Sequence, residues 1–191
     1  MEWMIEPTID ALAALRSATA ERHAQLDAGL AIGAAHASLA DYRAHLCMLR
    51  GWLAPLECWL AGYDDGPQAA LDEVLRVPLI EADLADPAIS DAPPVAREAG
   101  AWPVNASAAY RWGVCYVIEG SQLGGAVLYQ RLAAALAPHP LAYLRGAECG
   151  PGPRWRAFMQ ALRAEVRAPQ QIADACAGAR DAFDRILAMR G

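Results

Sequence analysis

The segment Tyr116-Val-Ile-Glu-Gly-Ser-Gln-Leu-Gly-Gly-Ala-Val-Leu128 places three glycines inside what the surrounding sequence predicts to be one long helix. From 105 to 136 the chain has no proline, is rich in alanine and repeats apolar residues at helical spacing. Each interior glycine costs a helix about 0.5–1 kcal/mol relative to alanine. Gly120 and Gly124 are one turn apart, so they bare the backbone on one face. That face fits either a close helix–helix crossing or a flat ligand lying against it.

A second predicted helix, near the N-terminus, carries a candidate metal ligand. His23 lies on or beside an apolar stripe, where a histidine is more often a core residue than a ligand. Asp27 follows one turn later, where its carboxylate can accept the proton of one ring nitrogen and orient the other toward a metal. Arg16 lies two turns earlier on the same face, about 10 Å along the axis. That spacing is close to the distance from a porphyrin iron to its propionate edge. The stripe consists of Leu12, Leu15, Thr19, Leu26 and Leu30.

Together these two segments resemble the haem oxygenase family. The pattern Arg-x-x-Thr-x-x-x-His at 16–23 is similar to the family's proximal helix, and Gly-Ser-x-Leu-Gly-Gly at 120–125 is similar to its distal helix. The variant Glu-Gly-Ser looks most like the bacterial branch, some members of which supply biliverdin to phytochromes. The resemblance runs from about residue 8 to residue 189. It implies one all-α domain over 1–191, with a loose tail at 1–7 and haem between the proximal helix and the glycine-rich distal helix.

On the proximal side the resemblance assigns His23 as the iron ligand, preceded by Thr19 one turn earlier. Asp27 stands where many members have a glutamate that orients the ligand, so its shorter side chain has less reach. Arg16 matches a basic residue near the propionates, although a solvated surface charge would look the same. Arg156 matches a second propionate contact. The family's next basic position is Gln160 here, with Arg154 or Arg163 as candidate replacements.

On the distal side Gly120 and Gly124 match the two glycines nearest the haem, with Gly125 adjacent. Animal enzymes carry an aspartate after the first glycine, and this chain has Ser121, whose hydroxyl can also hold a water molecule. Phe183 matches an aromatic position that lines the pocket, although a core phenylalanine would fit the pattern equally. Two further aromatic residues, Trp112 and Tyr116, precede Gly120 by two turns and one turn.

The implied activity is oxidative opening of the haem ring to biliverdin, with release of iron and carbon monoxide. Haem b would be both cofactor and substrate, and molecular oxygen the second substrate. The sequence has no Gly-x-Gly-x-x-Gly fingerprint after a predicted strand, so electrons are expected from an external reductase or ferredoxin. A phytochrome that accepts biliverdin is a further expected partner.

Four alternative functions remain to be weighed against this sequence. A non-catalytic haem carrier or sensor would need the same histidine and glycine face. A helical di-iron protein would need paired Glu-x-x-His motifs, which do not occur. A thiaminase-like enzyme would need a cysteine or acid constellation that these residues do not supply. A degenerate family member that no longer binds haem is the fourth alternative, based on Ser121, Asp27 and Gln160.

Composition favours a helical protein without broad nucleic-acid or membrane surfaces. The formal net charge of the 191 residues is −6, which argues against nucleic-acid binding. The acidic N-terminus does not resemble a signal peptide, and Arg111, Glu119 and Gln130–Arg131 prevent any apolar run of membrane-spanning length in the glycine-containing helix. The five cysteines are scattered without a Cys-x-x-Cys pair, as expected for reduced thiols in a cytoplasmic protein: Cys47, Cys58, Cys115, Cys149 and Cys176.

Proline and glycine clusters divide the chain into predicted helices. The first is expected to begin near Thr8 and to end near 29–33, and Ser38 with Asp41 resembles a capping box for the second. Pro55 falls inside that second helix and predicts a kink. The remaining irregular stretches are expected at 64–67, 91–103 and 146–153. The helices after the first are expected at 38–62, 68–75, 79–84, 105–136, 154–167 and 170–189.

Overall fold

The structure is a computed structural model that describes residues 10–89 and 100–189, and every regular element within these ranges is a helix. The predicted all-α fold class is therefore confirmed. The elements are α1 (Ala11–Ala28), the 3-10 helix η1 (Ala31–Gly33), α2 (Leu39–Leu60), α3 (Pro67–Ala70), α4 (Val77–Leu84), α5 (Ala108–Leu132), α6 (Ala142–Arg145), α7 (Gly152–Glu165) and α8 (Pro169–Ala188).

Several predicted boundaries are corrected. The first helix begins at Ala11, after Asp10 as its N-cap residue, while Thr8 and the expected tail at 1–7 lie outside the described residues, as does most of the irregular stretch 91–103. The expected helix at 68–75 is only the single turn α3. It stops because Leu71 is extended and the backbone N–H of Arg76 donates to the Glu57 carboxylate at 2.7 Å instead of continuing a helix. The short helix α6 was not predicted.

The caps of the two longest helices agree with their sequences. In α2 the Ser38 hydroxyl accepts from Asp41 N at 3.2 Å while Ser38 N donates to the Asp41 carboxylate at 2.8 Å, which confirms the capping box. Pro55 lies inside α2, and its kink stays a prediction. The α5 helix begins after the Ser107 cap, a few residues later than predicted, because Asn105 has a left-handed backbone with φ 63°.

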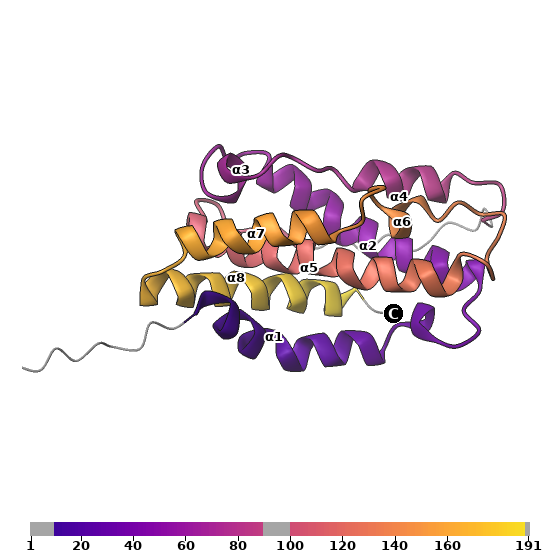
Figure 1. The fold of residues 1–191 in the computed structure, drawn as a ribbon, viewed down its shortest axis with the longest axis horizontal. Coiled ribbons are helices and arrows are strands. Elements are labelled where there is room, and N and C mark those ends of the chain that lie inside the picture. The colour runs from indigo at the N-terminus through magenta and orange to yellow at the C-terminus, as the bar shows by residue number, and fades with distance from the viewer. Residues whose placement is uncertain (1–9, 90–99, 190–191) are drawn as a thin grey trace, which may run out of the picture.

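The long helices are stacked around α8 and α5 (Figure 1). The α8 helix packs against α1 on one side and α5 on the other, and α7 also packs on α5. The α2 helix packs with α4 and α8. This arrangement puts the histidine helix α1 and the glycine-rich helix α5 on different sides of α8.

A close helix crossing does exist in this fold, but at glycines that the sequence analysis did not single out. A Cβ atom on Gly113 of α5 would stand 1.7 Å from the carbonyl oxygen of Ala175, and one on Gly178 of α8 would stand 2.1 Å from the carbonyl oxygen of Tyr110. The backbones of α5 and α8 therefore touch at these two glycines. Only glycine fits there.

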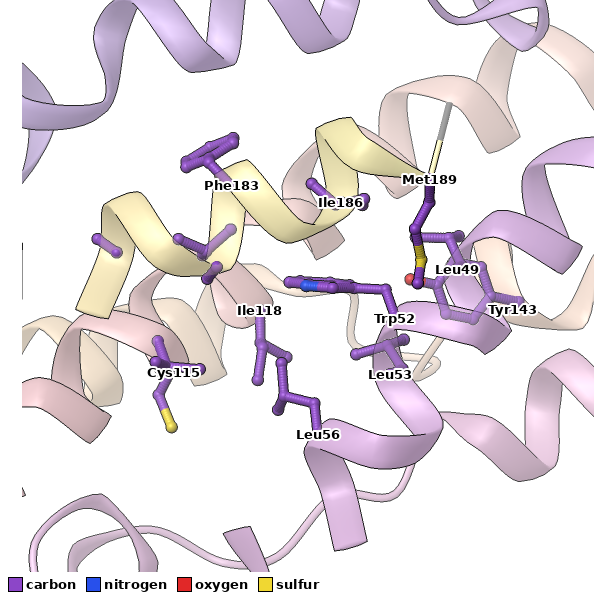
Figure 2. Packing of buried hydrophobic residues seen from close by; sticks show 14 of the residues in the cluster. Leu49, Trp52, Leu53, Leu56, Cys115, Ile118, Tyr143, Phe183, Ile186 and Met189 are labelled. Atoms are coloured by element: carbon purple, nitrogen blue, oxygen red, sulfur yellow. The ribbon is translucent and has the colours of Figure 1, made fainter. Parts of the chain in front are cut away.

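The core beside this crossing is closed by α2. Figure 2 shows α2 side chains, including the flat indole of Trp52, facing Ile118 of α5 and the apolar face of α8. Trp52, Leu53 and Leu56 are fully buried. Side chains of α2, α5 and α8 therefore form one continuous apolar surface. Part of that surface lines a cavity.

Candidate functional site

A cavity of about 470 Å³ lies between α1, α2, α5 and α8, and most of its lining is apolar. The two segments that the sequence analysis linked, nearly a hundred residues apart, both face it. Arg16 and Arg156 are not in its wall. The predicted site residues that line it are Thr19, His23, Asp27, Gly120, Ser121, Gly124, Gly125 and Phe183.

The motif glycines of α5 leave room on the cavity side rather than contact another helix. A Cβ on Gly124 would meet nothing within 4 Å, and one on Gly120 would come only to 3.9 Å of the Trp155 ring. On Gly125 it would stand 3.8 Å from Leu144 Cδ2. These are ordinary or open distances, unlike those at Gly113. The helix-crossing explanation therefore does not apply to Gly120 and Gly124, whose bare backbone forms part of the cavity wall.

His23 reaches the same cavity from α1 with one ring nitrogen already engaged. Its Nδ1 lies 3.0 Å from Asp27 Oδ2, so the aspartate does span the distance that its length put in question. The Asp27 carboxylate can therefore accept the Nδ1 proton, which leaves Nε2 as the ring nitrogen available to a ligand. Phe183 lies edge-on to the imidazole, with ring centroids 5.9 Å apart, and limits its rotation.

Thr19 and Arg16 lie beside Tyr116 at one edge of the cavity. Thr19 is buried and its hydroxyl donates to the Leu15 carbonyl at 2.8 Å. Burial raises the pKa of the Tyr116 phenol, and the nearby Arg16 guanidinium and Thr19 hydroxyl partly oppose that rise. Arg16 is itself exposed. The guanidinium thus stands next to a residue of the cavity wall while remaining open to solvent.

Arg156 has no such contact with the wall. It is exposed, and its Nη1 lies 3.7 Å from where a Cβ on Gly152 would stand, at the start of its own helix. The two candidate replacements for a basic residue at Gln160 are engaged elsewhere. Arg154 Nε lies 2.9 Å from Glu119 Oε2, and Arg163 Nε lies 3.1 Å from Asp10 Oδ1.

Glu119, the residue before Gly120, ties α5 to neighbouring segments through ion pairs. It is 7% exposed and binds two arginines, with Arg76 Nη2 2.9 Å from Oε1 and Arg154 Nε 2.9 Å from Oε2. Arg154 is adjacent to Trp155, whose ring faces Gly120. The ion cluster therefore fixes α7 and its tryptophan against the glycine face.

The cavity residues that sequence reasoning missed include His45, Trp155 and Tyr143. The sequence assigned no functional role to His45. Its Nδ1 is buried with no hydrogen-bond partner among the described residues, and burial lowers the pKa of His45 to about 4. The helical spacing of His45 with Leu49 and Trp52 was the one available signal for it. Tyr143 lies on the unpredicted helix α6, so no periodic pattern marked it.

Comparison with known proteins identifies the family of this chain. The family model described as "Heme oxygenase" matches residues 9–189. The chain belongs to the haem oxygenase family. It is 35% identical over 166 residues to the protein named heme oxygenase from Xanthomonas campestris pv. campestris (strain 8004), covering 80% of this chain and 90% of that protein.

The fold agrees with a solved structure as well. A Neisseria meningitidis heme oxygenase, studied with NO and CO bound, superposes with a TM-score of 0.66 over 96% of this chain and 90% of that chain, at 22% identity. The predicted family and haem-oxygenase fold are confirmed, and family membership supports haem degradation over the carrier or sensor alternative. No described helix combines the length and the apolar character needed to cross a membrane.

Proposed function

We propose that this haem oxygenase binds haem in the cavity between α1 and α5, with His23 Nε2 as the axial ligand and the backbone at Gly120 and Gly124 against the opposite face. The observation that carries the proposal is the free space at these two glycines. A Cβ on Gly124 would meet nothing, on the wall of a cavity that His23 also lines.

The cavity suits a large, flat, mostly apolar ring. Its volume of about 470 Å³ is within the range of about 300–1,000 Å³ that is usual for small-molecule sites. Apolar side chains of α1, α2 and α5 supply most of the wall, including Leu26, Met48 and Leu128. A bare helix backbone lets a planar ring approach more closely than a side chain would.

His23 would bind the haem iron as a neutral imidazole. The Asp27 carboxylate lies 3.0 Å from Nδ1, so it can accept the Nδ1 proton and keep Nε2 directed away from that contact. Haem held by His23 would supply the iron that activates oxygen, and the overall reaction would open the ring to biliverdin with release of iron and carbon monoxide. The backbone at Gly120 and Gly124 would limit the space on its side of the ring.

Ser121 stands next to Gly120 on the same wall. Its hydroxyl donates to the Ile118 carbonyl at 2.7 Å, one turn back in α5, so its oxygen is left to accept a hydrogen bond. Gly125 and Phe183 complete the contact surface on the distal helix and on α8. Thr19 lines the same cavity, and its hydroxyl donates to the Leu15 carbonyl one turn earlier in α1.

Two arginines are proposed for the propionates. Arg16, at the exposed edge beside Tyr116, would bind one of them, and Arg156 would bind the other from α7. Electrons would come from an external reductase or ferredoxin. Biliverdin transfer to a phytochrome, a cytoplasmic location and a single domain spanning 1–191 complete the proposal.

The test is turnover of the reconstituted complex. Purified protein is titrated with haem, then supplied with a ferredoxin system and oxygen, and the product is identified by its absorption spectrum and by chromatography. We expect biliverdin and carbon monoxide from the wild type. The His23→Ala variant should lose turnover, and added imidazole should restore part of it. A wild-type complex that keeps its haem intact under these conditions would identify a carrier instead.

A further inference from the structure

Three polar side chains meet where α5 passes α6, on the distal side of the cavity. The Gln122 amide nitrogen lies 3.2 Å from Ser121 Oγ and 3.2 Å from the Tyr143 hydroxyl, so it donates to both. Ser121 Oγ in turn donates to the Ile118 carbonyl. Two hydroxyl groups, one from each helix, are therefore held around one amide.

The three side chains of this cluster differ in whether they have a proton left to donate. The Gln122 amide protons point at the two hydroxyl oxygens, and the Ser121 proton lies on its own helix backbone. The Tyr143 hydroxyl accepts from Gln122, which leaves its own proton to donate. Because Tyr143 lines the cavity, rotation about its C–O bond can direct that proton toward an acceptor there. Burial raises the pKa of Tyr143, which keeps the phenol protonated.

The tyrosine is rigidly positioned. Asp83, a fully buried carboxylate on α4, accepts from the first two backbone N–H groups of α6, those of Ala142 at 2.9 Å and Tyr143 at 2.8 Å. The Tyr42 hydroxyl donates to the same carboxylate at 2.6 Å. Figure 2 shows the Tyr143 ring packed beside Leu49 and Met189. A helix of one turn would be unstable alone, so this capping carboxylate determines where the phenol lies.

We propose that Tyr143 is the hydrogen-bond donor of the distal side, which donates to the diatomic ligand bound above the haem, while Gln122 positions its hydroxyl. The inference rests on the proposed function, because it takes the haem to lie against the glycine face. It places the donor on α6, whereas Ser121, next to Gly120 on α5, already donates its proton to the Ile118 carbonyl.

Carbon monoxide is the probe, because the C–O stretching frequency of the ferrous haem complex falls when a donor approaches the bound oxygen atom. Tyr143→Phe keeps the ring and removes the hydroxyl, and Ser121→Ala is the matched control. We expect the frequency to rise in Tyr143→Phe and to change little in Ser121→Ala. Exchange into D₂O should shift the wild-type band but leave the Tyr143→Phe band in place. Turnover should fall on the order of 10²-fold in Tyr143→Phe, the lower range for a positioned donor.

The Gln122→Met variant gives a second route to the same result if Tyr143→Phe folds poorly. It removes the amide that orients the phenol, so the C–O band should broaden or shift while haem still binds. An unchanged band in both Tyr143→Phe and Gln122→Met, or a rise in Ser121→Ala alone, would overturn the inference. If the wild-type protein formed no CO complex with haem, or if His23→Ala formed the same complex as the wild type, the proposed function itself would be refuted.

Discussion

Replacing Gly124 by leucine should stabilise the apoprotein and impair the haem site. Nothing lies within 4 Å of the position that a Cβ would take at Gly124, so the new side chain begins in open space on the cavity wall. Leucine ranks just below alanine as a helix former, so the gain over glycine is slightly less than the ~0.8–1.0 kcal/mol that separates glycine from alanine. For a chain of this length, that gain raises the melting temperature by about 2–4 °C.

The same leucine would occupy space that the haem needs. The side chain would project from the wall of the cavity of about 470 Å³ that His23 faces from α1. We expect haem affinity to fall by at least about tenfold, which corresponds to about 1.4 kcal/mol. Turnover to biliverdin should fall with it, because the ring can no longer lie flat between the imidazole and the backbone.

Gly113→Ala provides the matched control, since it also adds carbon to a glycine of α5. Its Cβ would stand 1.7 Å from the Ala175 carbonyl oxygen, so α5 and α8 must move apart. The apoprotein should lose about 1–3 kcal/mol or more. Differential scanning calorimetry of both apoproteins, followed by haem titration and a biliverdin assay, separates the two roles. A destabilised Gly124→Leu apoprotein, or one that binds and degrades haem normally, would refute the assignment of this glycine to the haem face.

Three other predictions follow from single contacts. The Arg16→Ala and Arg156→Ala substitutions should each weaken haem binding by about 1 kcal/mol, measured by optical titration, and unaltered affinity and biliverdin isomers in the double variant would show that both are surface charges. Glu119→Leu leaves two arginines unpaired and should lower the unfolding free energy in urea by about 3–5 kcal/mol; a loss below about 1 kcal/mol would show that the cluster does not anchor α5. His45, with a folded pKa of about 4 against 6.5, binds its proton more weakly when folded, so stability falls as the pH drops from 6.5 toward 4, by up to about 3 kcal/mol. Urea unfolding at several pH values should show a smaller loss in His45→Phe, and identical pH profiles would contradict the buried setting of this histidine.

The parts of the site that could be predicted from sequence are local. His23 and Asp27 are one turn apart on one helix, so their contact depends only on α-helical geometry. The glycine motif likewise lies within the single helix α5. The motif alone could not distinguish a haem face from a helix crossing. That distinction needed the position of α8, which touches α5 at Gly113 and leaves Gly124 free.

The parts that could not be predicted depend on contacts between distant segments. Tyr143 reaches the cavity only because Asp83, far earlier in the chain, caps the one-turn helix α6. A helix this short has no hydrophobic period to detect. The ion pairs of Glu119 are similar, since Arg76 follows an extended segment that was predicted to be helical. Such long-range polar contacts are set by the tertiary structure.

The most direct test of the account is the iron–histidine stretching mode of the ferrous haem complex, observed by resonance Raman spectroscopy. In the structure His23 Nδ1 lies 3.0 Å from Asp27 Oδ2, which leaves Nε2 to bind the iron. We predict a mode that shifts when histidine is labelled with ¹⁵N, is absent in His23→Ala and moves to lower frequency in Asp27→Ala, where the ligand loses its hydrogen-bond partner. A mode that persists unchanged in His23→Ala would contradict the account, because the iron would then be bound by another residue.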